Sequence, residues 1–172
     1  FVTTSSDVPP EMFYGRIDEL RAVMAQDGRC LVYGGRQLGK TALLRHAERA
    51  FHQPARHHFA RWIDLRGEGV GYASEPSEVW MVIWRELQRV GALPDSIMEP
   101  KSTVKGRVQS FLDGMKGWFE ENTDRRLLLL LDEADRFLAL DARNQYQDTV
   151  RLKNLMEATS RRFKVVFAGL HN

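Results

Sequence analysis

The stretch Gly34-Gly35-Arg36-Gln37-Leu38-Gly39-Lys40-Thr41 decides the fold that we predict for this chain. It fits the pattern G-x-x-x-x-G-K-[ST], in which glycines permit a tight turn and backbone N–H groups point inward at an anion. The apolar run 30–33 precedes it, and a helical pattern over 41–51 follows it. Because this pattern has to join a strand to a helix, the context favours a phosphate-binding loop over an incidental glycine-rich turn.

The residue types in this loop suit a polyphosphate. Lys40 would supply a mobile positive charge to the terminal phosphates, and the Thr41 hydroxyl could ligate Mg²⁺. Arg36 is equally compatible with contacting phosphate or a partner subunit and with plain solvent exposure. We expect nucleotide contacts from the following residues: Gly34, Gly35, Arg36, Gln37, Leu38, Gly39, Lys40, Thr41 and Ala42.

A second motif, at 127–133, is a run of five leucines that ends in two carboxylates. A strand this apolar is typical of a parallel sheet covered on both faces, and ligands bind at the carboxyl ends of such strands. We expect Asp132 to hold Mg²⁺, through water, next to Thr41, and Glu133 to orient or deprotonate an attacking water. The alternative is that the two acids form only a solvated strand exit.

The rest of the pattern alternates between helices and strands. Apolar residues at three- and four-residue steps predict helices over 16–26, 41–51, 77–90, 104–119 and 144–160. Short apolar runs predict strands at 30–33, 59–65, 127–131 and 164–168. Strands separated by helices pair in parallel, so the fold class that we predict is α/β, a three-layer sandwich with a central parallel sheet. We expect 1–12 to be a leader or linker, and 13–172 to be one domain truncated after its fourth core strand.

The composition excludes several classes of protein. Hydrophobic residues make up 43% and charged residues 28% of the 172 residues, which excludes a disordered chain. With Lys+Arg 25 and Asp+Glu 23 the net charge is +2, so charge alone supports neither nucleic acid nor a membrane as a partner. No run reaches the ~18 apolar residues of a membrane span. The single cysteine, Cys30, cannot form an internal disulfide, and we expect a cytoplasmic protein.

Both motifs, together with Phe13-Tyr14-Gly15-Arg16-Ile17-Asp18-Glu19-Leu20, resemble P-loop NTPases of the ASCE type, specifically the AAA+ and signal-transduction ATPase (STAND) group. The resemblance implies that Gly15 and Arg16 lie beside adenine and that a polar sensor, Asn172 or His171, follows the fourth strand. It implies ATP or ADP and Mg²⁺ as cofactors. It also implies, as partners, further C-terminal domains of a parent protein and a nucleotide-dependent homo-oligomer.

The function that we expect is Mg²⁺-dependent ATP binding and hydrolysis, used as a switch or motor for other domains. Turnover would be slow, because the arginine finger implied by the resemblance lies beyond 172. Two alternatives stay open. One is a nucleotide-binding switch with negligible hydrolysis. The other is a DEAD-type helicase motor, whose acidic motif is spelled by Asp132-Glu133-Ala134-Asp135.

Other residues that could carry chemistry have simpler structural interpretations. Arg161 and Arg162 could be mistaken for a finger, but a basic helix end that complements its own dipole explains them more simply. Cys30 is expected in the strand before the loop, as a buried spacer. A set of aromatic residues is expected to pack in the core or an interface rather than stack on bases: Trp80, Trp84, Trp118 and Phe119.

Overall fold

A computed structural model of the chain describes residues 16–33 and 39–169. Four strands form one all-parallel sheet in the order β1-β4-β3-β2. The strands are β1 (Leu31–Tyr33), β2 (His58–Asp64), β3 (Arg126–Asp132) and β4 (Phe163–Gly169). The helices are α1 (Ile17–Met24), α2 (Lys40–Phe51), α3 (Val79–Arg89), α4 (Arg107–Glu121), α5 (Asp135–Arg143) and α6 (Gln147–Ala158).

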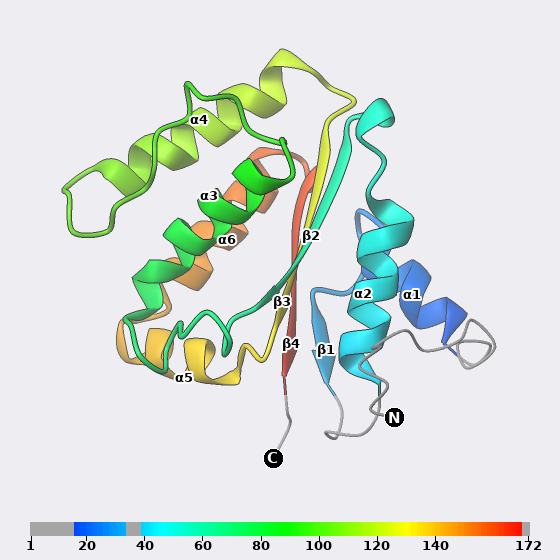
Figure 1. Cartoon of the computed structure of the whole chain (residues 1–172), viewed down its shortest axis with the longest axis horizontal. Coiled ribbons are helices and arrows are strands. Elements are labelled where there is room, and N and C mark those ends of the chain that lie inside the picture. The colour runs from blue at the N-terminus through cyan, green and yellow to red at the C-terminus, as the bar shows by residue number, and fades with distance from the viewer. Residues whose placement is uncertain (1–15, 34–38, 170–172) are drawn as a thin grey trace, which may run out of the picture.

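The helices form a layer on each face of the sheet (Figure 1). The apolar side chains of α1 and α2 pack against one face, where they meet alternate residues of the strands such as Leu128 and Leu130. The other four helices cover the opposite face, where Leu127 and Leu129 belong to the larger core. The predicted fold class, α/β with a central parallel sheet between helices, is confirmed.

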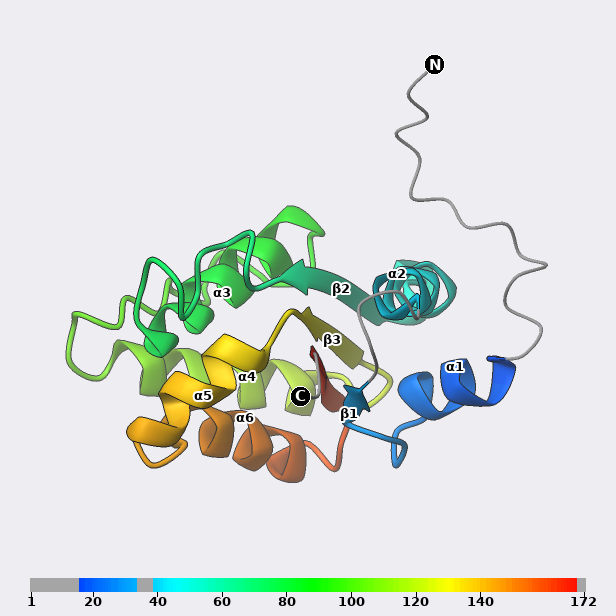
Figure 2. The same ribbon diagram turned by 90° about the horizontal axis from the view of Figure 1, so that it is seen from below.

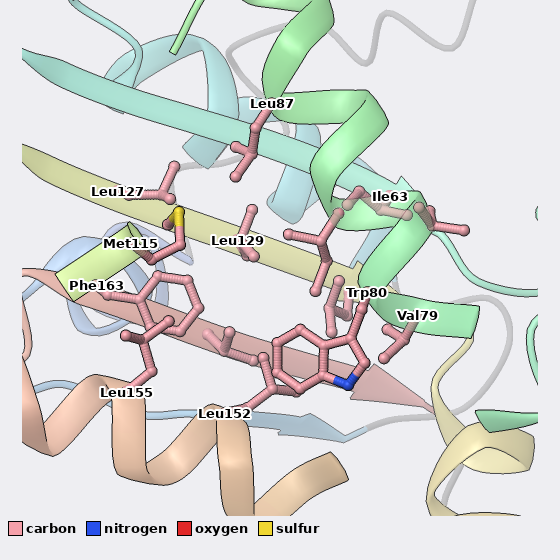
Figure 3. Close-up of a cluster of buried hydrophobic side chains, with 14 of the residues drawn as sticks. Ile63, Val79, Trp80, Leu87, Met115, Leu127, Leu129, Leu152, Leu155 and Phe163 are labelled. Carbon is pink, nitrogen blue, oxygen red and sulfur yellow. The ribbon is translucent and has the colours of Figure 1, made fainter. Parts of the chain in front are cut away.

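The leucine run explains why β3 occupies the interior of the sheet. All five leucines of the run are at most 1% exposed, because odd-numbered and even-numbered side chains point to opposite faces and both faces are covered. Figure 3 shows Leu127 and Leu129 on one face of the sheet, among side chains from neighbouring strands and from the helices that cover that face, with Trp80, Met115 and Phe163 around them. The predicted core packing of Trp80, Trp118 and Phe119 is confirmed, and Trp84 is partly buried against the same core.

The sequence pattern does not predict helix α5, and the helix that it predicts over 144–160 begins three residues before α6. The helix α5 has only nine residues, of which Phe137 and Asp141 are buried, so its apolar pattern is shorter than the window of about 11–18 residues over which helical periodicity is read. The break before α6 is made by Gln145 and Tyr146, both of which have a positive φ. Gln and Tyr rarely adopt that conformation, and the boundary contains no glycine or proline. The sequence therefore gives no signal of a break at this position.

Two smaller interpretations are wrong. Cys30 precedes β1 instead of lying in it, and it is half-buried, with Arg161 donating to its sulfur at 3.2 Å. Arg161 and Arg162 do not complement the end of their own helix. Arg161 donates to the carbonyls of Gln26 and Gly28 after α1, and Arg162 donates to two carbonyls at the end of α4.

Within the described ranges, no helix has both the length and the apolar character needed to cross a bilayer.

Candidate functional site

The candidate site lies at the edge where all four strands end. Figure 2 looks onto this edge, and the amino-terminal end of α2 lies there as well (Figures 1 and 2). The strands are parallel, so the carboxyl ends of β1, β3 and β4 share one edge. The registers place Asp64 opposite Asp132 at the ends of β2 and β3.

Thr41 and Asp132 are in direct contact. The Thr41 Oγ1 donates a hydrogen bond to Asp132 Oδ2 at 2.6 Å, which joins the first turn of α2 to the end of β3. Asp132 is 2% exposed, and its two oxygens also accept bonds from Trp62 Nε1 at 3.2 Å and from the backbone N–H of Glu133 at 3.0 Å. Three donors from three segments therefore fix this carboxylate in one orientation.

Lys40 brings a buried cation to the same edge. It is 7% exposed, and its Nζ donates to the carbonyl of Gly169 at 2.6 Å, at the end of β4. A Cβ on Gly169 would lie 2.5 Å from Asp135 Oδ1, so the Asp135 carboxylate lies directly against this strand end. The end of β4 therefore has an ammonium group beside its carbonyl and a carboxylate beside its Cα.

Arg16 and Gly39 are neighbours across the gap between α1 and α2. Gly39 is the residue before α2 and has a φ of +67°, a conformation that favours glycine. A Cβ built on it would lie 3.5 Å from the Arg16 guanidinium, which also pairs with Glu19 at 2.8 Å. The structure thus places Arg16 next to the last part of the predicted loop.

Glu133 follows Asp132 in a left-handed conformation, with a φ of +52°. Non-glycine residues seldom adopt this conformation, and such backbone is concentrated at functional sites. The turn lets the next backbone N–H, that of Ala134, donate to the carbonyl of Ala168 on β4 at 2.9 Å. Glu133 itself is half-buried.

Several predicted site residues lie outside the described residues. These are Gly15, Gly34, Gly35, Arg36, Gln37, Leu38, His171 and Asn172. Ala42 is described; it lies in α2 and packs against the core between α2 and the sheet. The described geometry therefore brings together Arg16 with Gly39, and Thr41 with Asp132, and it places Lys40 at the end of the strand between β1 and β3.

Comparison with protein-family models, with curated proteins and with solved structures gives no match. The interpretation of the site therefore depends on its own geometry.

The oxygens of Thr41 and Asp132 fit a Mg²⁺ site that is completed by a further ligand. Mg²⁺ takes oxygen ligands and is commonly held by one or two carboxylates together with substrate phosphates and water. The Thr41 hydroxyl donates its hydrogen bond to Asp132, and its oxygen lone pairs can still ligate a cation. Among the residues that the structure describes, no group of three or more His, Cys, Asp or Glu side chains could hold a metal without help. Thr41 and Asp132 would thus hold Mg²⁺ only together with another ligand such as a phosphate.

Sequence reasoning missed Trp62 and Asp135 at this edge. Trp62 lies two residues before the end of β2, on the same face of that strand as Asp64. Only the pairing of β2 with β3 brings its indole to Asp132, and the sequence does not reveal which strands are neighbours. Asp135 was noticed only as a letter of the helicase motif, although its spacing from Asp132 already placed it near the strand end.

Proposed function

We propose that this chain is a P-loop NTPase domain that binds Mg²⁺·ATP at the carboxyl edge of its sheet and hydrolyses it to ADP and phosphate. The observation that carries the proposal is the 2.6 Å bond between Thr41 and Asp132, which lie 91 residues apart. Each residue was predicted to bind Mg²⁺ from a separate sequence motif. Two motifs that matched by chance would not be expected to bring their predicted ligands into contact.

Lys40 and Gly39 would bind the phosphates, and Arg16 would contact the nucleotide beside them. The ammonium of Lys40 lies at the amino-terminal end of a 12-residue helix, where the helix dipole also favours an anion. Arg16 adds a second cation beside Gly39. These groups stabilise negative charge on the transferring phosphoryl group, which is the main source of catalysis in phosphoryl transfer.

Asp132 and Thr41 would hold Mg²⁺, which when bound neutralises charge on the phosphate oxygens. Glu133, the residue after Asp132, is the base in this scheme. Its carboxylate takes a proton from water as the water oxygen forms a bond to the γ-phosphorus. The bond from that phosphorus to the bridging oxygen breaks, and ADP leaves with the electron pair.

The test compares Lys40→Ala and Glu133→Gln with the native chain. Calorimetry measures Mg²⁺·ATP binding, and a phosphate-release assay measures turnover. Lys40→Ala should weaken binding by about tenfold or more, the effect of losing a hydrogen bond to a charged group. Glu133→Gln should keep binding and lower the turnover rate by roughly 10²–10⁴-fold, the usual contribution of a general base.

Matched controls come from exposed helix residues, with Lys153→Ala for the lysine and Glu120→Gln for the glutamate. Both controls should behave as the native chain does. Turnover that survives both site substitutions would overturn the assignment. Tight binding without phosphate release would instead identify a nucleotide-binding switch, and ATP-dependent strand separation would identify a helicase motor.

A further inference from the structure

Three side chains from α2 and β3 contact Trp62. Its backbone N–H donates to Glu48 Oε1 at 2.9 Å, and the Arg45 guanidinium lies 3.7 Å from the centre of the indole. Its Nε1 donates to Asp132 Oδ2 at 3.2 Å. Such a stacked cation stabilises an aromatic ring in place. The indole of Trp62 therefore has its orientation fixed before any ligand arrives.

The indole and the Thr41 hydroxyl donate to the same oxygen, Asp132 Oδ2, but they differ chemically. A hydroxyl both donates and accepts, so Thr41 can also ligate a cation. An indole N–H only donates, so Trp62 can hold the carboxylate but can never compete for the metal. Arg45 follows Thr41 by one helical turn, so α2 supplies both the hydroxyl and the group that fixes the ring.

We propose that Trp62 is a positioning residue of the Mg²⁺·nucleotide site, whose N–H orients the Asp132 carboxylate toward Thr41 while Arg45 fixes the ring. This inference rests on the proposed function, because it assigns Trp62 a role in that same site. It predicts that removing the N–H weakens the response to Mg²⁺ more than it weakens the fold. Groups that hydrogen-bond a ligating carboxylate commonly change metal affinity by 10–100-fold when they are removed.

The test is Trp62→Phe in the 172-residue chain, with Trp80→Phe as the matched control. Trp80 also donates its Nε1 to a buried carboxylate, Asp148 Oδ1 at 2.7 Å, but in the core on the other face of the sheet. Binding of ADP is measured at increasing Mg²⁺ concentrations. Trp62→Phe should raise the Mg²⁺ concentration that gives half-maximal binding by about tenfold. Trp80→Phe should lower the melting temperature and leave that concentration unchanged.

The outcomes separate this inference from the proposed function. If the native chain binds ADP in a Mg²⁺-dependent way and Trp62→Phe has the native midpoint, Trp62 has no positioning role and the inference alone is wrong. If the native chain shows no Mg²⁺-dependent nucleotide binding, the proposed function fails and the inference fails with it. A tenfold shift in Trp62→Phe that is absent from Trp80→Phe supports both.

A second measurement applies if Trp62→Phe does not fold. The chain has four tryptophans, so its indole N–H groups give four resonances, and Phe variants of Trp80, Trp84 and Trp118 leave that of Trp62 assigned by elimination. Mn²⁺ together with ADP should broaden the Trp62 resonance and leave that of Trp80 intact. Equal intensities for these two resonances after saturation with Mn²⁺ and ADP would overturn the inference.

Discussion

Replacing Lys164 with methionine should remove a pH dependence of stability that we expect of the native chain above about pH 8. Lys164 is on β4 and is 3% exposed. Its Nζ donates to the carbonyls of Ala22, Val23 and Ala25, at the carboxyl end of α1, at 3.1, 2.7 and 2.5 Å. Burial of the ammonium, with Arg161 nearby, lowers the pKa of Lys164 to about 8 from an ordinary 10.5.

The sign of the effect follows from where the proton is bound. Between pH 8 and 10.5 the folded chain has lost the Lys164 proton while the unfolded chain still carries it. The unfolded state then binds more protons, so the contribution of Lys164 to the free energy of unfolding rises with pH across this window. With these two pKa values the rise between pH 7 and pH 10 is about 2.5 kcal/mol.

Urea unfolding at pH 7 and at pH 10 measures this rise. The difference in unfolding free energy between the native chain and Lys164→Met should change by about 2.5 kcal/mol between the two pH values. Lys153→Met is the control, because the Lys153 side chain is 71% exposed, and its difference from the native chain should stay constant. A constant difference for Lys164→Met as well would refute the reasoning.

Two other substitutions test the packing around the site and the core. Asp141 is fully buried and accepts three hydrogen bonds at the start of α6. Asp141→Ala should therefore lower the free energy of unfolding, measured by urea titration, by about 2 kcal/mol or more. A loss below ~0.5 kcal/mol would contradict this expectation. Gly169→Ala would place a Cβ 2.5 Å from Asp135 Oδ1, beside the carbonyl that binds Lys40. In this variant, calorimetry should show a nucleotide affinity about tenfold lower than that of the native chain. The urea midpoint should change little, because the displaced group is the end of the Asp135 side chain. An unchanged nucleotide affinity in Gly169→Ala would argue against this geometry.

Much of the fold could be predicted because its strands are short apolar runs between helical patterns. The parallel sheet follows from that alternation and from the leucines of β3, which only a doubly covered sheet can bury. Helix α5 was harder to predict, since its nine residues are fewer than the roughly 11–18 over which helical periodicity is read, and Phe137 is its only fully buried apolar residue. Its separation from α6 depends on positive φ values at Gln145 and Tyr146, a conformation that neither residue type signals.

The residues of the candidate site that belong to sequence motifs could be predicted. A residue that reaches the site only through the order of the strands could not. Lys40, Thr41 and Asp132 were selected from two motifs, and the contact of Thr41 with Asp132 needed no other information than a shared sheet edge. Trp62 reaches Asp132 only because β2 pairs with β3 in a register that sets Trp62 opposite Leu130. The basic pair after α6 was assigned to its own helix because the carbonyls that it binds belong to segments far away in the sequence.

The packing of α2 explains how the two motifs meet. β1 and β3 are separated by β4, so two strand spacings, roughly 10 Å, lie between the strand before the loop and the strand that carries Asp132. α2 follows β1 in the chain, yet it packs against β2 and β3, with Leu43 and Leu44 fully buried on the sheet. Its first turn therefore reaches the end of β3, where Thr41 contacts Asp132 directly. The apolar face of α2 therefore helps to set the contact that carries the proposed function.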